Sequence, residues 1–211
     1  MALAQQAESK AVILMELILA SGSPRRKEIL ENMGYRFTVK TFGCSEELES
    51  GTEPKDAAGI LAKRKALAAF EKLRESGKTD FTVVGSDTVV ASGGEILGKP
   101  ENKSDAVCML LKLSGKTHSV YTGVCVKNEN YEEVFVNETK VEFYPLSEEM
   151  CRRYVETGEP MDKAGAYGIQ GLGSVLVKKI DGDFFSVMGL PAAQTARALK
   201  NAGVVSGKEI V

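Results

Sequence analysis

The sequence contains no tryptophan and one histidine, His118, and its aromatic residues make up only 7% of the chain. Proteins that bind single-stranded nucleic acid stack bases on aromatic side chains, which are scarce in this chain. The net charge of −2 also differs from the basic balance that is typical of nucleic-acid binders. We therefore expect no nucleic-acid partner.

Closely spaced cysteine pairs are also missing. The four cysteines, Cys44, Cys108, Cys125 and Cys151, never have CxxC spacing, which disfavours a zinc site or a thioredoxin-type motif. Scattered thiols are typical of a reducing compartment, so we expect a cytoplasmic protein. No apolar run is long enough to cross a membrane. The short apolar run 11–15 lacks a preceding basic segment, so we interpret residues 1–11 as a disordered leader and 12–211 as a single domain.

The remaining composition, 43% hydrophobic and 27% charged over 211 residues, is that of an ordinary globular domain or two closely joined lobes. Periodicity and turn residues predict strands at 17–20, 37–42, 81–84, 117–126, 131–143 and 174–180, with a hairpin turn at 93–94. They predict helices that begin at Pro24 and near Ser147, and at 54–75, 104–113 and 190–201. This mixture indicates an α/β fold: a central mixed β-sheet flanked by helices, with two lobes and a cleft between them.

The run Ala20-Ser-Gly-Ser-Pro-Arg-Arg-Lys27 is the most informative stretch. It reads as strand, tight loop and helix. Pro24 suits the first helical position, and Ser23 suits the N-cap before it. Helix N-terminal amides attract anions, and Arg25 and Arg26 add planar cations for phosphate oxygens. We therefore expect a site for a polyphosphate.

Two further polar segments follow predicted strands, and strand-end loops of α/β sheets meet at one edge. Gly85–Thr88 carries Asp87, and Glu159–Gln170 carries Asp162, Lys163, Tyr167 and Gln170. Cations beside a carboxylate suggest phosphoryl chemistry assisted by a divalent metal, Mg²⁺ or Mn²⁺. Asp87 would hold the metal, accept a proton from water, or do both. Either Glu46 or Glu47 would complete the metal shell, and Lys65 and Lys99 would bind further phosphate oxygens.

Each pattern also has an ordinary structural interpretation. Ser-Pro-Arg-Arg is most often a capped helix start with solvated arginines, and an isolated Asp is most often a turn residue. The basic run 63–65 would mostly face solvent, with at most one or two side chains pointing inward. Asp162 and Lys163 would pair at the surface, and His118 would be a structural histidine. The residues taken one by one leave these alternatives open.

Taken in order, the segments resemble the Maf family. They are Leu19-Ala-Ser-Gly-Ser-Pro-Arg-Arg26, Gly85-Ser-Asp-Thr88, Gly98-Lys-Pro100, Leu113-Ser-Gly-Lys-Thr-His118, Thr122-Gly123 and Glu159-Pro-Met-Asp-Lys-Ala-Gly-Ala-Tyr-Gly-Ile-Gln-Gly171. The resemblance extends from about Leu17 to Leu199. It implies a fold shared with inosine triphosphatases, a possible homodimer, and cleavage of nucleoside triphosphates to the monophosphate and pyrophosphate.

The resemblance also implies roles for individual residues. Asp87 matches the proton acceptor. Ser21, Arg26, Lys65 and Lys99 match polar residues of the phosphate site, and Arg25, Thr88 and Gln170 match positions associated with base choice. The segment around Gln170 is similar to the subgroup that acts on dTTP and UTP. The alternatives are the same reaction on 7-methyl-GTP or 5-methyl-CTP, or a non-catalytic nucleotide-binding regulator of cell division.

Overall fold

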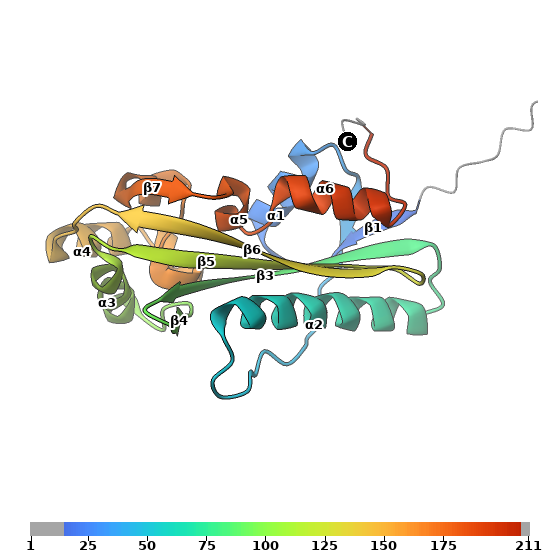
Figure 1. The fold of residues 1–211 in the computed structure, drawn as a ribbon, viewed down its shortest axis with the longest axis horizontal. Helices are drawn as coiled ribbons and strands as arrows, with labels where there is room; N and C mark the ends of the chain where they lie inside the picture. The colour runs from blue at the N-terminus through green and yellow to red at the C-terminus, as the bar shows by residue number, and fades with distance from the viewer. Residues whose placement is uncertain (1–14, 208–211) are drawn as a thin grey trace, which may run out of the picture.

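The computed structural model describes residues 15–207, which form one mixed β-sheet with helices on both faces (Figure 1). The elements, in chain order, are β1 (Glu16–Leu19), α1 (Pro24–Asn32), β2 (Phe37–Val39), α2 (Pro54–Glu75), β3 (Phe81–Ser92), β4 (Glu95–Leu97), α3 (Lys103–Leu113), β5 (Thr117–Lys127), β6 (Glu132–Phe143), α4 (Glu148–Glu156), η1 (Glu159–Asp162), η2 (Ala164–Ala166), η3 (Gly171–Leu176), β7 (Val177–Asp181), α5 (Phe184–Met188) and α6 (Ala192–Asn201). The predicted α/β class with a mixed sheet is confirmed. The expected leader, residues 1–11, lies outside the described residues.

The sheet has the strand order β2-β1-β3-β5-β6-β7, with β4 paired to β3 as a hairpin. β1 is parallel to β2 and β3, and the other pairs are antiparallel. The parallel pairing of β1 with β3 ends where Leu19 faces Val84, but β3 continues to Ser92 along β5. Residues of β3 beyond Val84 therefore lie beside the turn that leads from β1 into α1.

This topology corrects one expectation. The segment Gly85–Thr88 is not a loop after a strand, because it lies inside β3 and is paired residue by residue with β5. Asp87 faces Gly123 in this pairing. Asp87 is accessible to the site because the neighbouring strand β1 ends at Leu19, whereas β3 itself continues to Ser92.

Two separate clusters of buried side chains divide the molecule into two lobes. One contains Leu110, Phe143 and Val155 and lies with α3 and α4, at the left of Figure 1. The other contains Leu17 and Leu199 and lies with α1 and α6, towards the right. β3, β5 and β6 run through both lobes, so the lobes share one sheet.

α2 and α6 cover opposite faces of the sheet (Figure 1), and α2 packs unusually close to the sheet. A Cβ atom added at Gly85 would lie 2.5 Å from the carbonyl oxygen of Ala62, and one at Gly123 would lie 2.2 Å from that of Ala58. Only glycine allows the backbones to approach this closely. The two glycines therefore set how near the side chains of α2 come to Asp87.

Element ends differ from the expectations where pairing partners run out. The strand expected over 37–42 ends at Val39, where its partner β1 also ends. The strand expected over 174–180 begins only at Val177, because residues 171–176 form η3. The terminal helix begins at Ala192 instead of 190. The short helix α5 was not predicted at all.

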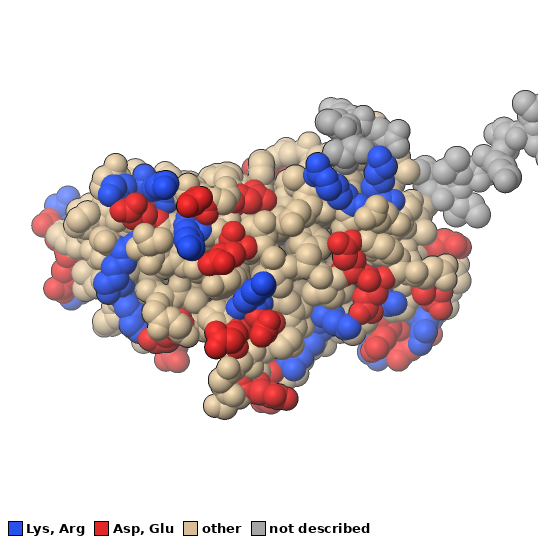
Figure 2. Space-filling model, viewed as in Figure 1, with Lys and Arg blue, Asp and Glu red and all other residues tan. Residues whose placement is uncertain are grey.

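The surface carries interspersed charges. Figure 2 shows lysine and arginine side chains next to acidic ones across the face in view. Exposed pairs of this kind, such as Lys72 with Glu75 at 2.9 Å, are screened by water and contribute little to stability. Within residues 15–207, no helix combines the length and apolar character needed to span a membrane.

Candidate functional site

A cavity of about 610 Å³ lies between the two lobes. Its wall combines the β1–α1 turn, one side chain of α2, the middle of β3, the 3-10 segment 159–171 and the end of α5. The structure brings eight of the predicted site residues to this wall: Ser21, Arg25, Arg26, Lys65, Asp87, Thr88, Lys99 and Gln170. The cleft expected between the lobes is therefore present, and it collects the segments singled out in the sequence.

Arg26 is enclosed by hydrogen-bond acceptors. Its Nε donates to the carbonyl oxygen of Gly189 at 2.8 Å, Nη1 to Oγ of Ser21 at 2.9 Å, and Nη2 to Oγ1 of Thr88 at 3.2 Å. Burial lowers the pKa of Arg26 to about 10, although the charge of Asp87 acts in the opposite direction. Arg26 therefore remains cationic at neutral pH, with a fixed orientation and further N–H groups for a ligand.

The predicted capping role of Ser23 is wrong in one respect. Ser23 occupies the N-cap position of α1, but its side chain makes no capping hydrogen bond. Instead, the backbone N–H of Ser23 donates to Oγ of Ser21 at 3.3 Å. Ser21 is buried and also receives Arg26, so it orients the turn and the cation together.

Lys65 is the member of the basic run 63–65 that points into the site. Its Nζ lies 2.5 Å from Oδ1 of Asp87 and 2.8 Å from Oε1 of Glu46. Burial alone would lower the pKa of Lys65, but the charge of Asp87 and the hydrogen bonds to both carboxylates raise it above its ordinary value. The hydrogen bond and charge of Lys65 lower the pKa of Glu46. Lys65 and Glu46 are therefore both charged at neutral pH.

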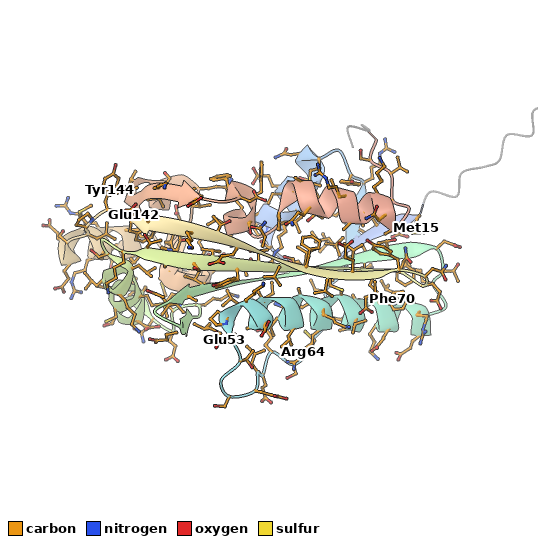
Figure 3. The ribbon with its side chains drawn as sticks, viewed as in Figure 1. Met15, Glu53, Arg64, Phe70, Glu142 and Tyr144 are labelled. Carbon is orange, nitrogen blue, oxygen red and sulfur yellow. The ribbon has the colours of Figure 1, made fainter. Side chains whose placement is uncertain are left out.

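The structure separates the two candidate glutamates. Glu46 contacts Lys65 through its carboxylate. Glu47 contacts α2 through its backbone, because its carbonyl oxygen accepts a hydrogen bond from Nη1 of Arg64. The same nitrogen also donates to the carbonyl oxygen of Ser45 at 3.3 Å. Figure 3 shows Arg64 extending from α2 beside the loop that precedes the helix. The neighbouring basic residues Arg64 and Lys65 thus both tie this loop to α2.

The residues present fit a divalent cation. Within residues 15–207 there is no ready-made cluster of three or more histidine, cysteine or acidic side chains. However, the carboxylates of Asp87 and Glu46 both contact the single ammonium group of Lys65. Magnesium is commonly held by one or two carboxylates together with substrate phosphates and water, so this pair meets the protein's share of the donor set.

Ser86, next to Asp87, is a buried structural residue. Its Oγ lies 2.9 Å from the carbonyl oxygens of both Gly123 and Gly189. It connects β3 and β5 to the end of α5, whose Gly189 also receives Arg26. The serine therefore helps to place the acceptor that orients Arg26.

The segment 158–173 contains more regular structure than the loop expected there. It forms η1, η2 and the start of η3. Asp162 and Lys163 pair at 2.6 Å, as expected, and Asp162 also lies 3.8 Å from Arg25, which lines the same cavity. Tyr167 is buried, and its hydroxyl lies 2.9 Å from Nε2 of His118, which gives the histidine a structural partner.

Sequence reasoning missed several residues of the wall, among them three that come from two short helices. Val187 and Met188 line the cavity from α5, and Glu159 lines it from η1. A signal for α5 was available: Asp183 caps it by accepting from the N–H of Phe185 at 2.8 Å, and Gly189 ends it with φ of 118°. No local signal marked Glu159, because two of the three groups that its carboxylate binds lie more than ten residues further along the chain.

Comparison with known proteins places this geometry in a family. The family model described as Maf-like protein matches residues 16–202. A dTTP/UTP pyrophosphatase of Bacillus pumilus is 47% identical over 90% of this chain and 97% of its own length. Another protein of that name, from Bacillus velezensis, is 48% identical over 87% and 95% of the two chains.

Among solved structures, the Staphylococcus aureus Ham1 protein aligns with a TM-score of 0.39 and 17% identity, over 61% of this chain and 71% of that one. The family match covers both lobes and every segment of the cavity wall. Together with the identity to the Bacillus proteins, it shows that the chain belongs to the Maf family.

Proposed function

We propose that the protein hydrolyses nucleoside triphosphates, with dTTP and UTP as preferred substrates, to the nucleoside monophosphate and pyrophosphate. The observation that carries the proposal is the convergence of Arg26, Lys65 and Asp87 on one cavity between the lobes. Two oriented cations suit a polyphosphate, and the carboxylate beside them suits an attacking water. The names of the Bacillus relatives support the choice of substrate.

In the proposed reaction, the oxygen of a water molecule forms a bond to the α-phosphorus. The bond from that phosphorus to the oxygen bridging the α- and β-phosphates breaks, and pyrophosphate leaves with the bridging oxygen. Asp87 accepts the proton that the water loses. Arg26, Lys65 and Lys99 neutralise the phosphate oxygens, so the protein contributes mainly position and charge.

The contact between Lys65 and Asp87 suggests an order of events. The ammonium group of Lys65 lies 2.5 Å from the carboxylate of Asp87. Phosphate oxygens compete for the same ammonium group, which leaves Asp87 able to receive a proton. Binding of the triphosphate tail would therefore activate the base in the same step.

Asp87 and Glu46 would hold the divalent cation, Mg²⁺ or Mn²⁺. When bound, the cation would supply further positive charge to the phosphate oxygens. We assign Glu46 to this position in preference to Glu47, because only the Glu46 carboxylate reaches Lys65 beside Asp87.

Base choice is assigned to Arg25, Thr88 and Gln170 on the wall. A glutamine amide donates and accepts at once, which matches the adjacent donor and acceptor groups of uracil and thymine. Arg25 faces Asp162 at 3.8 Å, and Thr88 is fixed by Arg26 and by Thr122, whose Oγ1 lies 3.0 Å away.

A panel of triphosphates tests the proposal. The chain is incubated with dTTP, UTP, CTP, 5-methyl-CTP, GTP, 7-methyl-GTP or ATP, with Mg²⁺, Mn²⁺ or a chelator, and released pyrophosphate is measured. We expect dTTP and UTP to be hydrolysed fastest, and only with metal. A preference for a methylated nucleotide would overturn the assigned base. If no nucleotide releases pyrophosphate with metal present, a non-catalytic regulator would be favoured instead.

A further inference from the structure

The wall segment that carries Gln170 contains glycine at four positions between 165 and 173. Gly165 and Gly171 adopt φ of 70° and 65°, and Ala166 between them adopts φ of 56°. Glycine-rich backbone has high conformational freedom, so such a segment holds one shape only if other groups fix it. Gln170 itself is half-buried, and within residues 15–207 its side-chain amide makes no hydrogen bond.

One carboxylate fixes the segment on the C-terminal side of Gln170. Oε2 of Glu159 accepts the N–H of Leu172 at 2.9 Å, and Oε1 accepts that of Gly173 at 2.9 Å. Burial alone would raise the pKa of Glu159, but these two N–H donors and the hydroxyl of Tyr154 lower it. The carboxylate is therefore ionised at neutral pH, and charged acceptors form the stronger hydrogen bonds.

One hydroxyl connects both sides of Gln170. Tyr154 on α4 donates to Oε1 of Glu159 at 2.9 Å, and its oxygen accepts the N–H of Gly168 at 3.0 Å. Tyr154 is only 6% exposed and packs in the core of its lobe, so the anchor belongs to a well-packed helix. Burial raises the pKa of Tyr154, which keeps the hydroxyl protonated as a donor.

The glycines make these contacts possible. A Cβ at Gly171 would lie 2.7 Å from Oε2 of Glu159, and one at Gly173 would lie 2.5 Å from the hydroxyl of Tyr154. The chain thus wraps closely around the two polar groups. Backbone sites at 168, 172 and 173 are held, and Gln170 lies between them.

We propose that Glu159 and Tyr154 are positioning residues that set base selectivity, because they hold the backbone on both sides of Gln170. The inference rests on the proposed function, which assigns Gln170 to the base. A pocket rejects a mismatched base by leaving buried polar groups unpaired, and this requires that the amide keep one direction. Neither residue takes part in the transfer of the proton or the phosphoryl group.

The test uses Tyr154→Phe and Glu159→Gln in the full chain. We expect each to lower the ratio of kcat/KM between the preferred and a disfavoured base by roughly tenfold, while kcat on the preferred triphosphate changes by about threefold or less. Glu156→Gln is the matched control. Glu156 ends the same helix, α4, but it is exposed and pairs with Lys103 at 2.6 Å, away from the segment.

Amide hydrogen exchange provides a readout independent of activity. The N–H groups of Gly168, Leu172 and Gly173 should exchange faster in both variants than in the wild-type chain or the control. This measurement stands even if the wild-type chain cleaves no triphosphate, so failure of the proposed function and failure of the anchor can be told apart.

A double variant separates positioning from a general loss of stability. In a Gln170→Ala background, Tyr154→Phe should cause no further loss of base selectivity, because the side chain that it positions is absent. Tyr154→Phe removes a single oxygen, so it serves if Glu159→Gln fails to fold. Unchanged selectivity in Tyr154→Phe, or the same further loss without Gln170, would overturn the proposal.

Discussion

Lys65 of α2 and Asp87 of β3 form an ion pair at 2.5 Å, although they lie 22 residues apart in the sequence. Their side chains are 22% and 15% exposed, so the pair is largely withdrawn from water. The contact depends on the close packing of α2 over Gly85 and Gly123. It places a cation and a carboxylate at one point of the cavity wall, from which the first prediction follows.

Asp87→Asn should lower kcat by at least about a hundredfold, the usual contribution of a general base, while dTTP still binds. The amide is close in size to the carboxylate, but it cannot accept the proton from water. Pyrophosphate release and equilibrium dTTP binding are measured together. Asp80→Asn is the control, because Asp80 is exposed just before β3 and its φ of 56° suits asparagine. An active Asp87→Asn enzyme would refute the assignment.

Glu46→Gln should raise the Mg²⁺ concentration needed for half-maximal activity by about tenfold or more, a change that even outer-shell partners of a metal produce. Glu47→Gln should leave it unchanged, because Glu47 engages Arg64 through its backbone carbonyl. The two variants differ by one position in the same loop, so each controls for the other. Equal metal dependence in both would contradict the choice of Glu46.

Arg26→Ala should reduce kcat/KM by on the order of a hundredfold, because one oriented charge at the phosphates is lost. It should also destabilise the fold, because Ser21, Thr88 and Gly189 lose a shared donor. Lys27→Ala in the same helix is the control: Lys27 is exposed and lies 3.7 Å from Glu31. Urea unfolding and steady-state kinetics separate the two effects. Equal loss of activity in both variants would exclude the placement of Arg26 in the phosphate site.

Local patterns predicted the long helix Pro54–Glu75 with its observed ends, because Pro54 starts it and Gly77 follows its end. They also placed the strand-turn-helix around Arg26. Lys65 was a candidate from the sequence, but helix periodicity alone does not decide which of three consecutive basic residues faces the sheet. That choice depends on where α2 sits, and the glycines of two distant strands determine this.

Contacts between distant parts of the chain also explain why sequence analysis missed the role of Glu159 and the continuity of β3. The two backbone N–H groups that Glu159 accepts lie 13 and 14 residues further along the chain, so these contacts depend on the path of the whole segment. Gly85 and Ser86 suggested a break after Val84, but cross-strand pairing with β5 carries β3 through them. Tertiary pairing outweighs local turn preference at this point.

Gln170→Ala should lower the ratio of kcat/KM between the preferred and a disfavoured base by roughly tenfold or more, while kcat/KM for the preferred base falls less. The reason is that the wrong base is rejected when its polar groups face the Gln170 amide without forming hydrogen bonds, and alanine removes that mismatch. The measurement is kcat/KM across the triphosphate panel. Gln194→Ala on α6 is a control for loss of an amide, since Gln194 lies outside the cavity and bonds Asn137 at 3.0 Å. An unchanged preference profile would remove Gln170 from base recognition.

The burial of His118 leads us to expect that the folded chain loses stability in mild acid. It is 3% exposed, and burial lowers its pKa to about 4 from 6.5. Between these two pH values the unfolded chain binds a proton that the folded chain does not, so stability is full above about pH 6.5 and falls as the pH drops towards 4. The difference between about pH 7 and about pH 5 amounts to about 2 kcal/mol.

Urea unfolding of the wild-type chain and His118→Gln at those two pH values measures this effect. His118 is the only histidine of the chain, so the variant should lose most of the pH dependence in this window. Its stability at neutral pH will also differ, because His118 lies 2.9 Å from the hydroxyl of Tyr167, but only the slope tests the prediction. Glu46 and Glu159 have lowered pKa values, so they affect stability only below about pH 4.5, where carboxylates begin to be protonated. Their protonation therefore lies outside the measured range. Equal slopes for the two chains would show that His118 is protonated as easily in the folded state as in the unfolded one.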